Sequence, residues 1–164
     1  MTTAAILKLI TSSLAPWAQQ NQGSVEVAND LNHLFAILSI KPGGFRAGVH
    51  CVGEDKRGIY EEGQMVDREF WIALAYGRSL QLNKGDALVY GQSGGRPMFD
   101  IIEECRDQVR AINFDSQTTE AMCDYKGYKP LQAISPDFLI DGFYLRITLG
   151  VLLQGPGQPS QTPA

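Results

Sequence analysis

The glycine-rich stretch at residues 90–97, Tyr-Gly-Gln-Ser-Gly-Gly-Arg-Pro, has the composition of a loop that binds phosphate and stands before a predicted helix. Glycine lets backbone N–H groups approach an anion at the start of a helix. No Gly-Lys-Ser/Thr sequence follows, however, and Pro97 removes one of the N–H donors. We therefore interpret the stretch as a lead-in to the helix. Binding of a small ligand or nucleotide by residues 91–96 remains an alternative.

His50 and Cys51 are adjacent and would suit a base and a nucleophile. Neighbouring residues of a strand point to opposite faces, however, so the two side chains cannot form a pair there. His33 has no companion at metal-ligand spacing. Carboxylates also cluster at residues 54–62, where solvated charges at a loop tip are the simpler interpretation. No catalytic, cofactor-binding or metal-binding residue is predicted, and we expect a protein that is not an enzyme.

Composition places the chain among ordinary globular proteins. It has 164 residues, 44% hydrophobic and 20% charged, which suits one domain with a sizeable core. No apolar run is long enough to cross a membrane, and no secretory signal is recognisable, so we expect synthesis in the cytoplasm. Three cysteines without a Cys-x-x-Cys pair predict free thiols. The net charge of −4 disfavours a protein that holds nucleic acid on a basic surface.

The N-terminal third predicts a helix over residues 3–20, capped by Thr2 or Thr3 and kinked or shortened at Pro16. Residues 25–40 are ambiguous, because their apolar residues fit a helix as well as a buried strand. We expect a short helical or irregular stretch there, followed by a strand.

A long β-hairpin is predicted next. Its arms are residues 45–52 and 64–77, and a charged, glycine-bounded tip at residues 53–63 is too long for a tight turn. The return arm is apolar on both faces, so helices or another chain should cover both. Residues 78–96 are predicted to be irregular, with one short strand at residues 87–90.

The clearest predicted helix begins at Pro97. Proline is favourable there because the first N–H groups of a helix have no hydrogen-bond partner within the helix. One apolar stripe runs along it: Met98, Ile101, Ile102, Cys105, Val109 and Ile112. Residues 113–142 are expected to form a long connection, and residues 143–153 to form a final strand. These elements predict an α+β fold, a mostly antiparallel sheet with a long hairpin packed against two or three helices.

Residues 154–164 have no apolar side chain larger than proline or alanine, so this tail cannot offset its own ordering entropy. We therefore divide the chain into a domain at residues 1–153 and a Gly/Pro/Gln-rich arm at residues 154–164. The arm is expected to bind a neighbouring subunit or another part of an assembly.

The order of elements is an N-terminal helix, a long hairpin with a projecting charged tip, an amphipathic helix and a closing strand. Four segments carry the pattern: residues 6–10 (ILKLI), 67–75 (DREFWIALA), 98–102 (MFDII) and 145–149 (LRITL). This pattern resembles the tail terminator proteins of long-tailed bacteriophages, which are small α+β domains. The resemblance implies a structural virion protein whose copies form a hexameric ring on the tail tube, end tube polymerisation and join the head.

The implied partners are further copies of the chain, the tail tube protein and the head–tail connector or stopper protein. Genomic DNA would pass through the ring without specific binding. A head-completion or stopper protein and a tube subunit are the related alternatives. Interaction residues are expected at the hairpin tip and in the last strand and arm: Glu54, Asp55, Lys56, Arg57, Glu61, Glu62, Tyr144, Arg146, Gln154 and Gln158.

Overall fold

A five-stranded sheet in the order β1-β2-β3-β5-β4 organises the chain. The structure is a computed structural model that describes residues 2–39, 45–60, 63–76, 89, 96–114, 123–134 and 141–153. The elements are α1 (Thr3–Gln20), β1 (Ser24–Ala28), α2 (Leu31–Leu38), β2 (Phe45–Tyr60), β3 (Gly63–Tyr76), α4 (Met98–Arg110), β4 (Cys123–Pro130), the 3-10 turn η1 (Leu131–Ala133) and β5 (Asp141–Leu153). Among these described strands, β1 and β2 pair in parallel and the other three pairings are antiparallel. The predicted α+β class is confirmed.

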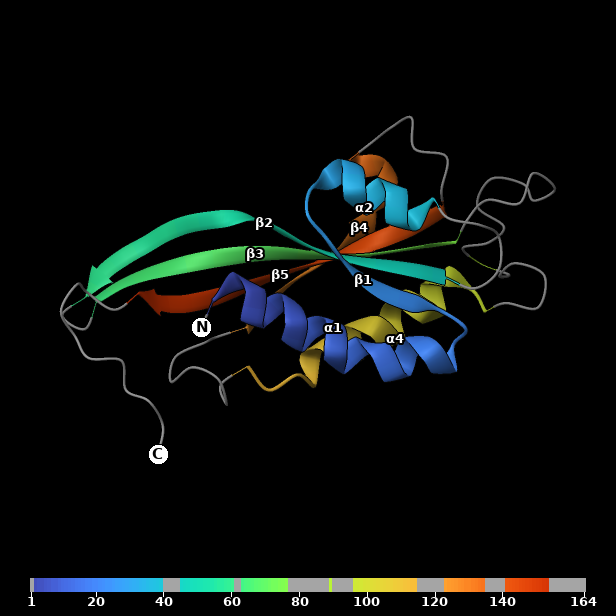
Figure 1. Cartoon of the computed structure of the whole chain (residues 1–164), viewed down its shortest axis with the longest axis horizontal. Coiled ribbons are helices and arrows are strands. Elements are labelled where there is room, and N and C mark those ends of the chain that lie inside the picture. The colour runs from blue at the N-terminus through green and yellow to red at the C-terminus, as the bar shows by residue number, and fades with distance from the viewer. Residues whose placement is uncertain are drawn as a thin grey trace.

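Helices cover both faces of one half of the sheet. Helices α1 and α4 lie on one face and α2 lies on the other (Figure 1). The larger core joins the first face to α1 and α4, and its largest fully buried side chains include Phe45, Phe70, Ile10 and Ile102. A smaller core joins α2 and η1 to Ala73 and Ala75. The return arm is therefore covered on both faces, as its composition predicts.

Helix α1 begins where it is predicted to begin. The Thr2 hydroxyl accepts a hydrogen bond from the N–H of Ala5, at 3.2 Å. The helix continues past Pro16 to Gln20. Because Leu14, Trp17 and Ala18 on either side of the proline are buried, tertiary packing offsets the backbone hydrogen bond that proline cannot make.

Residues 24–38 differ from the prediction, because the strand comes first and the helix second. Residues 24–28 form β1, which pairs with residues 46–50 of β2. Asp30 then caps α2 by accepting from the N–H of His33, at 2.8 Å. Helix α2 packs close to β2, because a Cβ at Gly48 would lie 2.3 Å from Leu34 Cδ1.

Two further expectations are corrected. Residues 53–60 are not a loop, since β2 runs to Tyr60 and stays paired with β3 through shifts in register after Cys51 and Lys56. The expected long connection at residues 113–142 contains β4, which pairs with β5. Of the short strand expected at residues 87–90, only Val89 is described, and its backbone is helical. The arm at residues 154–164 lies outside the described residues.

Candidate functional site

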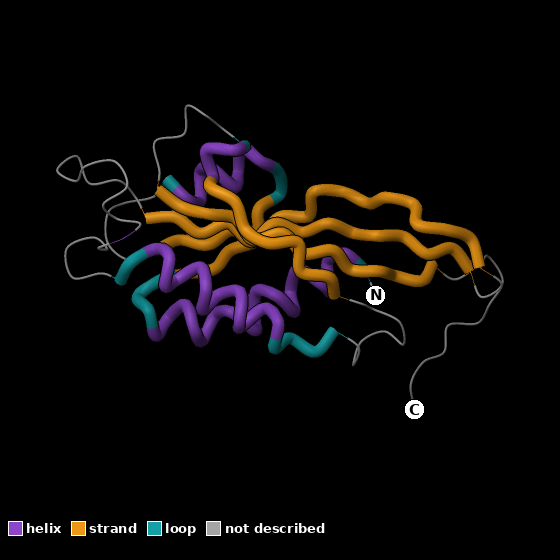
Figure 2. Tube along the Cα trace, turned by 180° about the vertical axis from the view of Figure 1, so that it is seen from behind, coloured by secondary structure: helices purple, strands orange, loops and turns teal. Residues whose placement is uncertain are grey.

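Three strands extend beyond both helical layers and form a ribbon, which is the most distinctive surface of the molecule (Figures 1 and 2). We define the ribbon as residues 53–60 of β2, 63–69 of β3 and 148–153 of β5, which pair continuously from Gly53 opposite Glu69 to Gln64 opposite Leu153. Its inner part belongs to the core, because Val66, Leu149 and Val151 are buried. The ribbon is thus a continuation of the sheet, with a firm base and an exposed end.

Ion pairs join neighbouring strands on both faces of the ribbon. On the face shared with α1 and α4, Arg68 Nε donates to Glu54 Oε2 at 2.7 Å. On the opposite face, Arg57 Nε donates to Asp67 Oδ2 at 3.0 Å. The Arg57 guanidinium also lies over β5, where a Cβ at Gly150 would come within 3.4 Å of its Nη1. Cross-strand pairs of this kind fix the register of long strands.

Two exposed aliphatic side chains of β2 lie at opposite ends of this segment. Ile59, near the end of the ribbon, is 73% exposed, and Val52, just before its base, is 41% exposed. Single exposed aliphatic residues are common on protein surfaces. Ile59, however, lies on the protruding element, two residues after Arg57, which is paired with Asp67. The ribbon therefore offers an apolar contact at its end and a paired charged surface behind it.

The predicted interaction residues of the hairpin fall into two groups. Glu54 and Arg57 are engaged in the cross-strand ion pairs just described. Asp55 and Lys56 lie between them on β2, and neither makes an ion pair with another described residue. Four of the predicted residues lie outside the described part of the chain: Glu61, Glu62, Gln154 and Gln158.

Tyr144 is wrongly predicted as an interaction residue, because only 4% of it is exposed. It belongs to the smaller core, and its ring centroid lies 4.9 Å from that of Trp71. Arg146 is partly exposed, and its Nε donates to Glu69 Oε1 at 2.8 Å. Burial acts to raise the pKa of Glu69, but hydrogen bonds from Arg146 and Trp71 together lower it. Arg146 therefore holds β5 to β3 where the ribbon begins.

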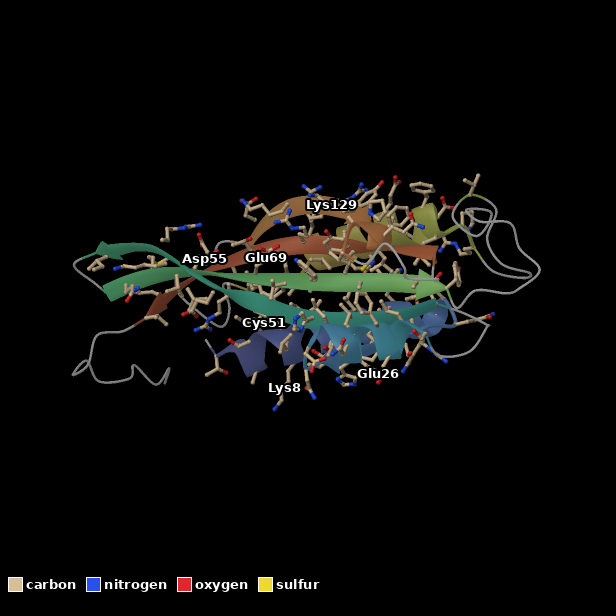
Figure 3. All side chains as sticks on the ribbon, turned by 90° about the horizontal axis from the view of Figure 1, so that it is seen from above. Lys8, Glu26, Cys51, Asp55, Glu69 and Lys129 are labelled. Atoms are coloured by element: carbon tan, nitrogen blue, oxygen red, sulfur yellow. The ribbon has the colours of Figure 1, made fainter. Side chains whose placement is uncertain are left out.

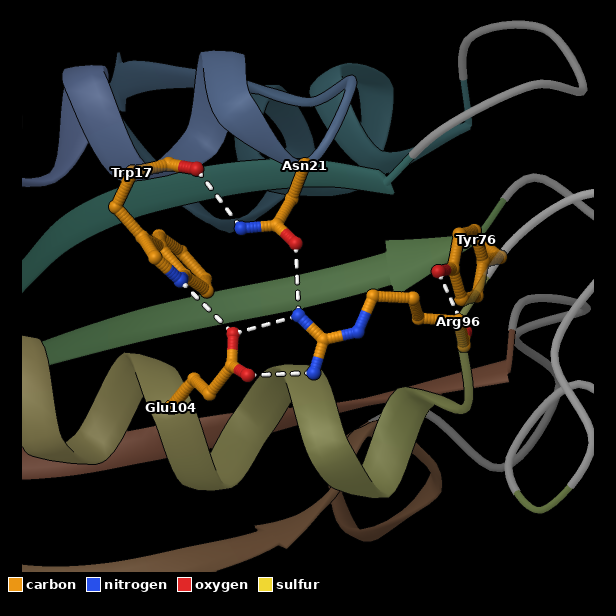
Figure 4. A network of polar contacts seen from close by, with 5 residues as sticks. All are labelled: Trp17, Asn21, Tyr76, Arg96 and Glu104. Atoms are coloured by element: carbon orange, nitrogen blue, oxygen red, sulfur yellow. Dashed lines mark hydrogen bonds and ion pairs between the residues drawn. The ribbon is translucent and has the colours of Figure 1, made fainter.

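A second polar network lies between α1 and α4, away from the ribbon (Figure 4). Glu104 Oε2 accepts from Trp17 Nε1 at 3.2 Å and from Arg96 Nη1 at 2.8 Å. Arg96 Nη1 also donates to Asn21 Oδ1, at 2.9 Å. The Tyr76 hydroxyl donates to the Arg96 carbonyl oxygen at 2.7 Å. The end of β3 is thereby joined to the start of α4, on either side of residues 77–95.

This network bears on the alternative of a ligand loop at residues 91–96. Residues 91–95 lie outside the described part of the chain, whereas Arg96 lies within it. Both terminal nitrogens of its guanidinium contact the Glu104 carboxylate. An Arg96 held in a bidentate pair is already committed to a structural partner. The described geometry therefore assigns Arg96 to joining α1 and α4 and gives the alternative no support.

Glu104 should make the stability of the fold depend on pH. Hydrogen bonds from Arg96 hold the pKa of Glu104 below its ordinary value, against the opposing effect of burial. The unfolded chain therefore binds a proton before the folded chain does as the pH falls. The contribution of Glu104 is complete above about pH 4.3, the ordinary glutamate pKa, and is lost as the pH falls through the folded pKa.

We expect Glu104→Gln to lower the melting temperature at pH 7 and to reduce the further loss between pH 5 and pH 3. Thermal unfolding followed by circular dichroism measures both. Glu103→Gln is the matched control, because Glu103 is exposed on the same helix and lies outside the network. Equal pH dependence in wild type and Glu104→Gln would show that Glu104 makes no such contribution.

His50 and Cys51 lie on opposite faces of β2, as the alternation of side chains along a strand predicts. His50 Nδ1 lies 3.3 Å from the carbonyl oxygen of Ala28, while Cys51 belongs to the opposite face and packs against the larger core. Burial raises the pKa of Cys51 and of Cys105. Within the described ranges, no three His, Cys, Asp or Glu side chains gather as metal ligands. None of the described helices is both long and apolar enough to span a membrane.

No protein-family model matches this chain, and no curated protein matches it.

Proposed function

We propose that the chain is a structural subunit of a bacteriophage virion, a tail terminator. Its copies close into a ring on the end of the tail tube, end tube polymerisation and present the surface that joins the head. The contacts of the ring are made with further copies of the chain, with the tube protein and with the head–tail connector or stopper. The protein is synthesised in the host cytoplasm and then becomes part of the virion.

The ribbon is the observation that best supports this proposal. It protrudes beyond both helical layers, has strand-to-strand ion pairs on both faces and exposes Ile59 at its end. A protruding strand element with paired charges and an apolar end is suited to insertion between neighbouring subunits, because strands give directed backbone contacts and apolar ends exclude water. An assembly subunit uses such a surface, whereas a protein that acts alone has no need of it.

The resemblance in element order supports the same proposal, with one adjustment. The pattern predicts a projecting charged loop, and the projecting element is instead a paired three-stranded ribbon. A ribbon is better defined than a loop of the same length, so a subunit can place it reproducibly against a neighbour. A head-completion or stopper protein and a tube subunit would use the same surface, and the mode of assembly distinguishes them.

To test the proposal, the mass of the purified protein in solution is measured over a range of concentrations, and the same samples are imaged by negative-stain electron microscopy. We expect closed rings near six subunits, about 108 kDa from six chains of 18.0 kDa, at the highest concentrations. A heterologous contact whose rotation closes gives a ring of fixed size. Long open-ended tubes formed by the protein alone would contradict the proposal and would identify a tube subunit.

A further inference from the structure

The outer margin of β2 changes character halfway along the strand. Residues 46–50 pair with β1, but no other described strand lies beside residues 51–60 on that side. Figures 1 and 2 show this half of β2 as the free margin of the ribbon. An unpaired strand edge presents a row of backbone N–H and C=O groups, which favours pairing with another strand.

The sequence of this margin is complementary to itself. Residues 51–60 read Cys-Val-Gly-Glu-Asp-Lys-Arg-Gly-Ile-Tyr, with two acids followed by two bases. A glycine flanks each pair of charges, and the exposed residues Val52 and Ile59 stand outside the glycines. When a second copy is aligned antiparallel, acids of each strand approach bases of the other, and the end that carries Ile59 approaches the end that carries Val52.

We propose that two copies of the chain pair antiparallel through residues 51–60 of β2, about a twofold axis at Asp55. The dimer forms while the chain is free in solution and not yet part of a larger assembly. The proposal concerns the ribbon's partner and does not depend on the phage assignment.

The faces of the strand fix the position of the axis. In an antiparallel edge pair the twofold axis is perpendicular to the sheet, so residues that meet must belong to the same face. Glu54 lies opposite Arg68 and Lys56 lies opposite Val66, two positions of β3 that share a face. With the axis at Asp55, Glu54 of each copy therefore meets Lys56 of the other on that face. Cys51 of each copy then meets Ile59 of the other.

On the opposite face this register brings like charges together. Asp55 meets Asp55 of the second copy at the axis, and Asp55 already lies opposite Asp67 within its own sheet. Arg57 lies on this face, where it holds Asp67. In the dimer Arg57 is the diagonal neighbour of Asp55 in the second copy, a distance that a long side chain can span. Arg57 can make that contact only if its guanidinium turns from Asp67 and Gly150 toward the second copy.

The same charges make this pairing selective. Charged residues and bulges protect natural edge strands from pairing with unrelated strands, and this margin has both, with register shifts after Cys51 and Lys56. Among these charges, Asp55 and Lys56 make no ion pair with another described residue, and an uncharged strand would give them none. A second copy places Glu54 opposite Lys56 twice about the axis, so this part of the edge favours a second copy over an uncharged strand.

The contact is small, because one strand pair buries far less than the roughly 1,200–2,000 Å² of a standard interface. We therefore expect a weak, concentration-dependent dimer. A twofold contact joins the same patch on both copies, whereas a single ring needs contacts between different patches. The dimer must consequently separate before its ribbons can contact a tube end.

The first test is cross-linking at the axis. Asp55→Cys is made in a Cys123→Ser background, because Cys123 is exposed and free. Directly opposed strand positions have Cβ atoms about 4.5–5.5 Å apart, within reach of a disulfide after small adjustment. We expect mild oxidation to yield a dimer of twice 18.0 kDa from Asp55→Cys. The control is Lys129→Cys, an exposed residue on β4 at the other margin of the sheet (Figure 3). A dimer yield no higher than that of the control would overturn the proposal.

The second test uses the natural charges and needs no new cysteine. In Lys56→Glu alone two acids meet at each Glu54–Lys56 position, and in Glu54→Lys alone two bases meet there. We expect each variant to dimerise about 10-fold more weakly than wild type by analytical ultracentrifugation. An equimolar mixture of the two should recover dimers, because both pairs between residues 54 and 56 then have opposite charges. A mixture that associates no better than its components would count against the twofold pairing, whatever the stability of each variant.

The dimer and the terminator assignment can each fail without the other. If rings form on tube ends but residue 55 does not cross-link, the dimer proposal fails and the terminator assignment stands. Cross-linked dimers from a protein that never forms rings would establish the dimer and remove the assignment. If both hold, the oxidised Asp55→Cys dimer should fail to bind tube ends until it is reduced.

Discussion

Val109→Asp is expected to abolish folding at 25 °C. Val109 is 1% exposed in the larger core, on the face of α4 that packs against the sheet and α1. A carboxylate at this position would have no cationic partner within the core, and an unpaired buried charge costs several kcal/mol. The lost packing of the valine adds to that cost. Together they approach the whole stability of a typical domain, roughly 5–15 kcal/mol.

The measurement is the far-ultraviolet circular dichroism spectrum and its thermal transition. Gln108→Asp provides the comparison, because it places the same side chain on the exposed face of the same helix turn. The control should keep a cooperative transition near that of wild type. A cooperative transition in Val109→Asp would mean that the helix α4 stripe is not the core that the structure describes.

Ile59→Asp is expected to reduce binding to tube ends by at least about 10-fold while leaving the fold intact. Ile59 is 73% exposed, so its replacement should change the stability of the subunit little. Burial of an isoleucine in an interface contributes about 1.5–3 kcal/mol, and about 1.4 kcal/mol corresponds to a factor of ten in affinity. A carboxylate that must be buried in the same place weakens the contact further.

The fraction of tube ends that carry the protein, counted by electron microscopy at several concentrations, gives the affinity. Leu31→Asp is the matched control, since Leu31 is another exposed aliphatic residue, 39% exposed, at the start of α2 and away from the ribbon. Equal binding by Ile59→Asp and Leu31→Asp would show that the end of the ribbon does not contact the tube.

The elements with long, regular patterns could be predicted from the sequence. The stripe on α4 and the alternation along β5 specify their own buried faces, and both elements lie within two residues of their expected bounds. The two-sided apolar character of the return arm likewise predicted cover on both faces, by helices or by another chain, and helices provide it. In these segments local pattern and tertiary packing agree.

The segments that were predicted wrongly are those in which tertiary contacts decide the structure. Residues 53–60 are charged and rich in glycine, which favours a loop, but ion pairs to Arg68 and Asp67 hold them as a strand. The order of β1 and α2 could have been inferred from Asp30, a favourable N-cap residue directly before the apolar stretch. The burial of Tyr144 depends on α2 and η1, which the alternation along β5 cannot reveal.

The position of the projecting element was predicted, but its form was not. Charge and length drew attention to the hairpin tip, and the ribbon stands there. Sequence periodicity could not show that β5 continues beside β3 to Leu153, which converts a two-stranded hairpin into three strands. Three strands with a buried inner layer are more stable than an isolated hairpin. This stability is what permits the ribbon to project and still hold a defined shape.

The most direct test of the terminator assignment is the length of tail tubes grown with and without the protein. The tube protein of the same virus is polymerised alone and with increasing amounts of this chain, and the tubes are imaged by electron microscopy. We predict a closed ring at one end of each tube and tubes that stop growing once capped. Tubes that lengthen equally in its presence and carry no added density at either end would contradict the assignment.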